Sequence, residues 1–163
     1  MKRAVEGRSR DASAASPGAA ERTRQLKKGR AHDGDAGGPW SVASASARDV
    51  ATAVALAALD KKAVGLEILD VAGKVDYADF LVIMTGRSDR HAQALAQGIE
   101  EALRKKGVRV VAVEGLPHAT WVLMDFGDVV VHVFQDEARE LYDIEGLWLD
   151  AGRLTVLAPI AQE

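Results

Sequence analysis

Histidines are the residues of this chain best suited to hold a metal ion, but their spacing argues against that use. His91, His118 and His132 stand far apart, and no two of them have the i,i+4 spacing that places two ligands on one helix face. The chain has no cysteine, which excludes a thiolate zinc site, a disulfide framework and a cysteine nucleophile. We therefore expect ordinary hydrogen-bonded histidines, with His132 partly buried, and neither metal ion nor cofactor.

Three short motifs look catalytic but lack the residues that would complete them. Ser88 and His91 could pair as nucleophile and base, yet Ser88 fits better as the cap of a helix. Asp125-Phe126-Gly127 matches the metal-binding triplet of protein kinases, without the Gly-rich loop or the H-R-D loop that must accompany it. The segment 85–88 has one glycine and lacks the Gly-Lys-Ser/Thr ending of a phosphate loop. We expect no catalytic residue.

A mixed aromatic and acidic surface is the remaining candidate site. Trp121, Leu123 and Asp125 share one face of a predicted strand, because side chains alternate along a strand. The last predicted helix adds Tyr142 and Trp148 among five carboxylates and one arginine. Such a surface is typical of an interface with a basic protein. The same composition also fits tryptophans in the core beside merely solvated acids, and composition alone does not decide between the two.

Hydrophobic spacing predicts the elements that position these side chains. Apolar residues at helical intervals predict three helices, over 46–62, 88–107 and 136–148. Short apolar runs bounded by turn residues predict five strands, over 66–71, 80–84, 108–113, 120–125 and 129–134. The last two strands form an antiparallel hairpin, because only three residues join them. The order predicts an α/β fold, a mixed sheet of about five strands with helices packed on it.

Local signals set the details of these elements. The Ser46-x-x-Asp49 spacing predicts the start of the first helix, and Gly107 predicts a left-handed end to the second. The strand 80–84 is apolar without alternation, which indicates helices on both of its faces. In the last helix we expect inward leucine and isoleucine side chains and a last turn weakened by Gly146. The inward side chains are Leu141, Ile144 and Leu147.

Charge divides the chain into a basic tail and an acidic body. Residues 1–40 contain nine Lys/Arg against five Asp/Glu, and the remaining residues contain twelve against nineteen. The segment 1–45 has few large apolar residues and no signal-peptide pattern, so we expect a disordered tail, at most weak RNA contact through it, and a cytoplasmic protein. The longest apolar run is far too short to span a membrane. An acidic body predicts basic partners and poor binding of phosphate backbones.

Two long segments strongly resemble the ribosomal silencing factor family, also called RsfS or Iojap. They read DYADFLVIMTGRSDRHAQALAQGIEEAL and WVLMDFGDVVVHVFQDEARELYDIEGLW, and the similarity runs from about Asp49 to Ala151. The resemblance implies a nucleotidyltransferase-like topology without an active site, in a domain over 46–151 followed by an extension over 152–163. It implies a translational repressor that binds the large ribosomal subunit through its ribosomal protein fourteen, blocks joining of the small subunit when nutrients are limiting, and affects ribosome assembly. It also implies a homodimer when the protein is free.

The resemblance and the surface composition together define a candidate partner-binding site, with Trp121 as its anchor. Its members are Trp121, Leu123, Asp125, Tyr142, Asp143, Glu145 and Trp148. The alternative is a nucleotidyltransferase-like metal-dependent enzyme that uses Ser88, Asp125 and Asp128. Such enzymes need a Gly-Ser turn and an Asp-x-Asp on the next strand, and the chain has neither.

Overall fold

The computed structural model describes residues 44–156, so the predictions for a disordered tail and for the last residues of the extension lie outside the described part. Its helices are α2 (Ala45–Asp60), α3 (Asp89–Lys105), α4 (Asp136–Tyr142) and α5 (Ile144–Leu147). Its strands are β1 (Val64–Asp70), β2 (Phe80–Thr85), β3 (Ala112–Glu114), β4 (Trp121–Asp125), β5 (Val129–Phe134) and β6 (Gly152–Leu154). None of the helices within this range combines the length and apolarity needed to cross a lipid bilayer.

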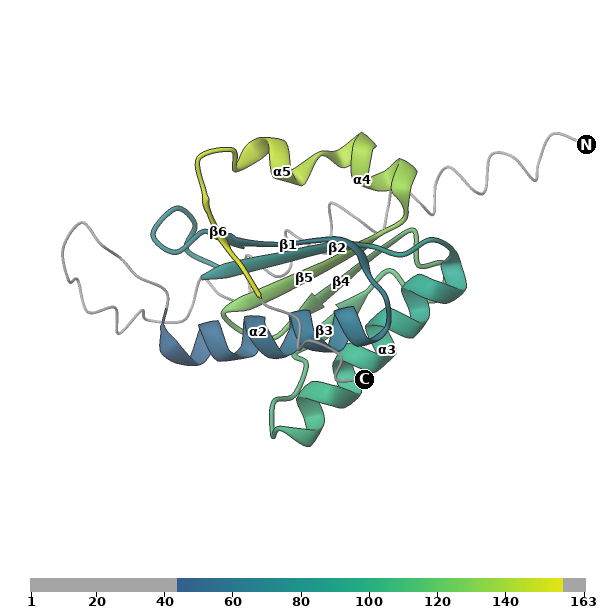
Figure 1. Ribbon diagram of the computed structural model, residues 1–163, viewed down its shortest axis with the longest axis horizontal. Helices are drawn as coiled ribbons and strands as arrows, with labels where there is room; N and C mark the ends of the chain where they lie inside the picture. Colours follow the sequence, from purple (N-terminus) through teal and green to yellow (C-terminus); the bar gives the residue numbers. More distant parts are fainter. Residues whose placement is uncertain (1–43, 157–163) are drawn as a thin grey trace, which may run out of the picture.

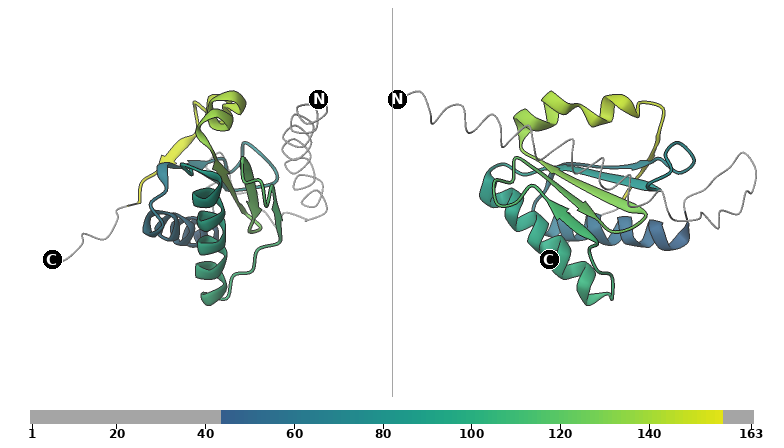
Figure 2. Two further views of the ribbon diagram at one scale, coloured as in Figure 1. Left: turned by 90° about the vertical axis from the view of Figure 1, so that its right-hand side faces the viewer. Right: turned by 180° about the vertical axis from the view of Figure 1, so that it is seen from behind.

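The strands form one mixed sheet between two helical layers. The strand order is β3-β4-β5-β2-β1-β6, in which β2 and β5 are parallel and every other neighbouring pair is antiparallel. Helices α2 and α3 cover one face of the sheet, while α4 and α5 lie across the other (Figure 1). The side and rear views show the same separation of the layers (Figure 2). This confirms the predicted α/β class, with six strands where about five were expected, because residues 152–154 pair with β1.

Strand β2 is central, as its uninterrupted apolar sequence predicts. All six of its residues are buried. Alternate side chains enter two separate cores: Phe80, Val82 and Met84 pack under α2 and α3, whereas Leu81 and Ile83 pack under α4. A strand with helices on both faces has no side that could carry polar residues, which is why the alternation is missing.

The two long helices begin with serine caps. The backbone amide of His91 donates to the Ser88 hydroxyl at 3.1 Å, which confirms Ser88 as the cap of α3. Gly107 has φ +80°, the left-handed conformation predicted at the end of that helix. Helix α2 begins two residues earlier than predicted, since Ser44 takes the capping role expected of Ser46 and accepts from the amide of Ala47 at 3.1 Å.

The strand predicted over 108–113 is mostly wrong. Only Ala112 and Val113 of that range belong to β3. The amide of Val108 still donates to the carbonyl of Leu103 at 2.9 Å, so the chain there completes the end of α3 before it can join the sheet. Exposed Val111 donates its amide to the carbonyl of Asp125 at 2.7 Å and leads into the short edge strand.

Candidate partner-binding surface on helices α4 and α5

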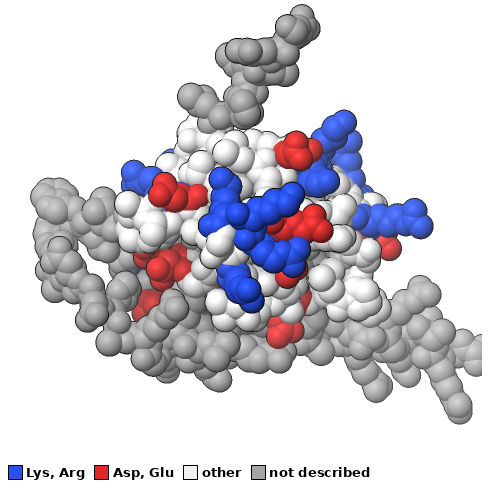
Figure 3. Space-filling view, turned by 90° about the horizontal axis from the view of Figure 1, so that it is seen from below, with Lys and Arg blue, Asp and Glu red and all other residues white. Residues whose placement is uncertain are grey.

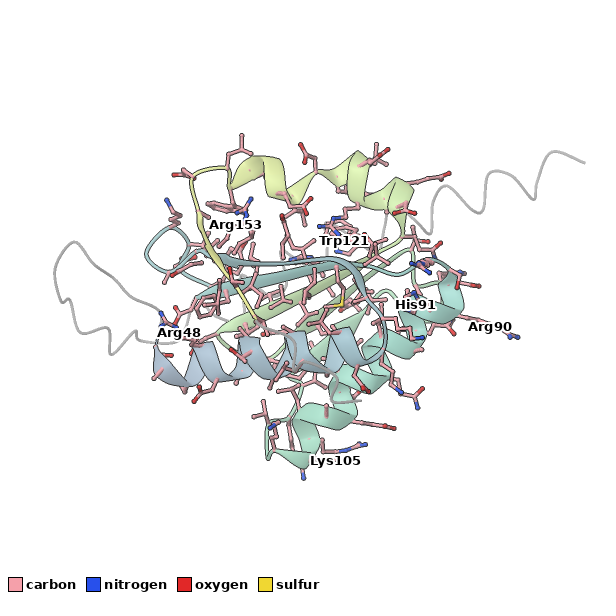
Figure 4. The ribbon with its side chains drawn as sticks, viewed as in Figure 1. Arg48, Arg90, His91, Lys105, Trp121 and Arg153 are labelled. Atoms are coloured by element: carbon pink, nitrogen blue, oxygen red, sulfur yellow. The ribbon has the colours of Figure 1, made fainter. Side chains whose placement is uncertain are left out.

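An aromatic cluster supports α4 on the sheet. Trp121 begins β4 and lies between the sheet and α4 (Figure 4). Its ring centroid is 4.5 Å from that of Tyr142 and 4.9 Å from that of Phe134. Only 8% of Trp121 is exposed, so its ring supports α4 from below and contributes little to the molecular surface. We call this ring the platform under α4. The predicted sharing of one strand face is confirmed, because Trp121 and Leu123 enter the core under α4 while Val122 and Met124 enter the other core.

A histidine fixes the orientation of this tryptophan. The indole Nε1–H of Trp121 donates to Nδ1 of His132 at 3.0 Å, so Nδ1 is unprotonated and the ring proton is on Nε2. Burial lowers the pKa of His132 from 6.5 to about 4, because the positive charge would be desolvated. His132 is therefore neutral at physiological pH. The prediction of a buried, hydrogen-bonded His132 is confirmed.

Asp125 and Leu123 do not reach the surface, which corrects the expectation that they take part in the contact area. Both are fully buried. The Asp125 carboxylate accepts from the backbone amide of Gly127 at 2.8 Å and thereby holds the β4–β5 turn. Four residues of extended strand put Asp125 about 13 Å from Trp121. Asp125 thus belongs to the far end of the strand, and its position does not depend on α4.

The predicted single helix over 136–148 is broken at Asp143. Asp143 takes the left-handed conformation with φ 40° and ψ 53°, ending α4 and starting α5. Its carboxylate accepts from the amide of Gly146 at 3.2 Å. A side chain at Gly146 would lie 2.3 Å from that carboxylate, so the glycine permits the break. Asp143 is therefore a capping residue whose side chain serves α5.

Arg139 and Glu145 hold the broken helix against the sheet. The guanidinium of Arg139 donates through Nη1 to the Thr85 hydroxyl at 2.9 Å and through Nε to Glu145 at 3.0 Å, and a second nitrogen contacts the same carboxylate. Gly65, with φ +59°, lets the guanidinium approach, because a Cβ there would lie 2.8 Å from Nη1. Glu145 is thus occupied within the fold, and the only cation of this segment is neutralised.

The outer surface of α4 and α5 is apolar and acidic. Leu141, Leu147 and Leu149 are 77%, 71% and 81% exposed. The expectation that Leu141 and Leu147 point inward is wrong, because the break at Asp143 interrupts the helical period on which it relied; Ile144 is half-buried in the core, as predicted. Tyr142 and Trp148 are half-buried at the same surface. The surface carries these exposed acids: Asp136, Glu137, Glu140, Asp143 and Asp150.

We call this set of exposed leucines and acids the α4–α5 face. The sequence pattern missed its leucines, since leucine at helical spacing ordinarily marks the buried side. The sequence feature that indicates their exposure is the high density of acidic residues around them, because a segment so rich in charge cannot be buried in a core. Asp150 is also paired with Lys74 at 2.8 Å, and that ammonium lowers the pKa of Asp150 by a hydrogen bond and by charge.

The residues of the enzyme alternative do not meet. Ser88 follows the end of β2 at which Thr85 pairs with Phe134, whereas Asp125 and Asp128 lie at the opposite end, where Phe80 pairs with Val129. The Ser88 hydroxyl is the cap of α3. Within residues 44–156, no three His, Asp or Glu side chains gather closely enough to hold a metal ion.

His91 also has a structural role. Its Nδ1 accepts from the amide of Arg87 at 2.9 Å, which leaves Nε2–H to donate to the carbonyl of Lys61 at 2.8 Å. These two bonds tie the start of α3 to the end of α2. As predicted, His91 is an ordinary hydrogen-bonded histidine.

Known proteins resemble this chain in sequence and in fold. Residues 44–163 match the sequence profile of the family described as "Ribosomal silencing factor during starvation". The "Ribosomal silencing factor RsfS" of Bacillus subtilis is 44% identical over 92 residues, which cover 56% of this chain and 78% of that protein. "Mitochondrial assembly of ribosomal large subunit protein 1" of Mus musculus is 32% identical over 99 residues, covering 59% and 43%.

Solved structures agree with this relationship. A crystal structure from Bacillus halodurans superposes with a TM-score of 0.60 at 33% identity, covering 67% of this chain and 99% of that chain. The sequence profile extends over more than half of the chain and includes every described helix and strand. The chain therefore belongs to the ribosomal silencing factor family.

Proposed function

We propose that this protein is a translational repressor that binds the large ribosomal subunit through its α4–α5 face. The observation that carries the proposal is the exposure of three leucines within an acidic rim, in a chain that belongs to this family. Burying a leucine side chain contributes about 1.5–3 kcal/mol, so a protein that covers these leucines gains the apolar centre of an interface. The names of the relatives from Bacillus subtilis and mouse support a ribosomal partner.

The charge of the face selects a basic partner. Residues 135–150 contain six carboxylates and one guanidinium, and that guanidinium is bound to Glu145. Ribosomal proteins that sit on RNA are basic, and the family resemblance points to ribosomal protein fourteen of the large subunit. Acidic residues around an apolar centre steer such a partner and reject acidic ones. The interaction should weaken as salt rises.

The predicted site residues take two roles in this proposal. Tyr142 and Trp148 are half-buried and extend the face, so they contact the partner beside the leucines. Trp121 and Leu123 hold α4 in place from below. Asp143 and Glu145 fix the angle between α4 and α5 through the cap at Gly146 and the bond to Arg139. Asp125 serves the distant turn and is left out of the contact area.

Repression then follows from occupancy, without any bond being made or broken. A domain of about 110 residues has a radius of gyration near 13 Å. Groups in direct contact between two subunits are separated by only a few ångströms. A bound domain of this size between the subunits therefore prevents those contacts from forming. The protein bound at the joining surface therefore prevents the small subunit from docking, which damps translation under nutrient limitation. Binding to free large subunits also allows a role in their assembly.

Substituting exposed leucines tests the proposal without disturbing the core. Leu141→Ser with Leu147→Ser should weaken binding to purified large subunits at least about thirtyfold in a co-sedimentation assay. The matched control is Leu56→Ser with Leu116→Ser, two leucines exposed elsewhere on the domain, which should bind like the unmodified protein. Equal binding by the two double variants would overturn the assignment of the α4–α5 face.

A further inference from the structure

The helical layer opposite the α4–α5 face carries a concentrated positive charge. Arg104, Lys105, Lys106 and Arg109 follow one another at the end of α3 without an intervening acid, and all four are exposed. We call them the basic end of α3. Seen from below, Lys and Arg side chains gather over the middle of this layer (Figure 3). The net negative charge of the body therefore hides two faces of opposite sign, which the sequence average could not show.

These cations are available to a partner. None of the four forms an ion pair or a side-chain hydrogen bond with another residue in the range 44–156. Glu100 and Glu101 stand four residues before Arg104 and Lys105 on the helix but do not pair with them. Arg104 and Arg109 line one shallow recess of about 420 Å³ together with Glu100 and Val110. Lys105 points away from the sheet at the lower edge of the molecule (Figure 4).

Two lysines extend the charge along the same layer. The aliphatic chain of Lys61 lies on α3 where Gly98 leaves room, since a Cβ at Gly98 would be 3.1 Å from two of its carbons. Lys61 and Lys62 are both exposed. The helical rise of 1.5 Å per residue puts Arg104 about 9 Å along α3 from Gly98. Exposed cations therefore extend from the end of α3 to the level of Gly98 on the same helical layer.

The chemistry of this surface fits RNA better than protein. Protein interfaces have an apolar or aromatic centre, whereas contacts to a phosphate backbone are made by Lys and Arg without one. Between residues 104 and 109 the only apolar side chain is that of Val108, which is half-buried. The α4–α5 face shows the contrary pattern, with three exposed leucines. The two faces therefore call for two different classes of partner.

We propose that the basic end of α3 binds the sugar-phosphate backbone of RNA while the α4–α5 face binds a ribosomal protein. This inference rests on the proposed function, because the large subunit presents both classes of partner side by side. The domain then sits in a recess of the subunit, held by protein on one side and by RNA on the other. Its orientation on the subunit is fixed by two contacts of opposite charge.

A salt titration of large-subunit binding tests this contact. The variant Arg104→Ala, Lys105→Ala, Arg109→Ala removes three exposed cations, and the matched control Arg48→Ala, Arg87→Ala, Arg90→Ala removes three exposed cations from the other ends of α2 and α3. All chains are full length, so the tail contributes equally. Each lost phosphate contact lowers the slope of log affinity against log salt by about one, so the test variant should show a slope smaller by about two to three. The control should keep the slope of the unmodified protein.

A second experiment asks whether the basic end of α3 binds RNA or any polyanion. A short labelled RNA duplex should bind the unmodified chain and the control, and should bind the test variant at least tenfold more weakly. Labelled polyglutamate should bind all three chains equally weakly. The RNA proposal is overturned if the test variant keeps the full slope and RNA affinity, or if polyglutamate matches the duplex. Failure of the unmodified protein to bind large subunits would instead overturn the proposed function. The experiment with the RNA duplex contains no subunits, so its result does not depend on that function.

Discussion

Acidification should remove the hydrogen bond on which the aromatic platform under α4 depends. Nδ1 of His132 accepts from Trp121, and a protonated ring has no free acceptor at that atom. Burial lowers the pKa of His132 from 6.5 to about 4, so at acid pH the unfolded chain binds more protons than the folded one. The stabilisation is therefore complete above pH 6.5 and is lost as the pH falls toward 4.

The size of the effect follows from the shift. One pKa unit corresponds to about 1.4 kcal/mol, so lowering the pKa of His132 from 6.5 to about 4 makes folding about 3 kcal/mol less favourable at low pH. The control is His132→Asn, because an asparagine oxygen takes the place of Nδ1 as acceptor and does not titrate. Carboxylates common to both chains then cancel in the comparison.

Urea unfolding, followed by tryptophan fluorescence at a series of pH values, measures this difference. Between about pH 7 and pH 4.5, the free energy of unfolding should fall by about 2–3 kcal/mol more for the unmodified protein than for His132→Asn. Parallel pH profiles of the two proteins would show that His132 titrates alike in the folded and unfolded states, and would overturn this prediction. Large-subunit binding should persist through this window and fall only below about pH 4, where His132 of the folded protein takes up a proton and the hydrogen bond to Trp121 is lost.

Two substitutions test the break between α4 and α5 and its attachment. Gly146→Ala places a Cβ 2.3 Å from the Asp143 carboxylate and should cost about 1 kcal/mol of stability through the lost cap, measured by urea unfolding; an unchanged or higher midpoint would count against it. Arg139→Met keeps the unbranched aliphatic part of the side chain but leaves Thr85 and Glu145 without this donor. It should lower the free energy of unfolding by about 2 kcal/mol in calorimetry and weaken subunit binding, and a fully stable variant would show that the clamp is dispensable.

The fold could be predicted where local sequence and tertiary packing agree. Helix α3 has a serine cap, a continuous apolar stripe and a glycine at its end, and each of these is a local property. Strand β2 is apolar throughout because it is buried from both sides. The β4–β5 hairpin follows from a short turn with glycine. These elements needed no knowledge of distant residues.

The site could be predicted only in part, because its form depends on contacts that are distant in the sequence. The break at Asp143 is held by the hydrogen bond from Arg139 to Thr85 in β2. No residue pattern within 136–148 predicts that Arg139 binds Thr85. Once the helix breaks, Leu141 and Leu147 turn outward. Trp121 lies beside Tyr142, and its burial depends on α4 covering it. The strand predicted over 108–113 is wrong over 108–111 for a local reason, since the amide of Val108 is bound to the carbonyl of Leu103 at the end of α3.

Subunit joining is the direct test of repression by occupancy of the large subunit. Purified small and large ribosomal subunits are mixed with increasing amounts of the full-length protein, and the joined particle is measured by sedimentation. We expect joined particles to disappear as the protein saturates the large subunit, and we expect Leu141→Ser with Leu147→Ser to abolish this effect. Undiminished joining at concentrations that fully occupy the large subunit would show that the bound protein does not block the small subunit.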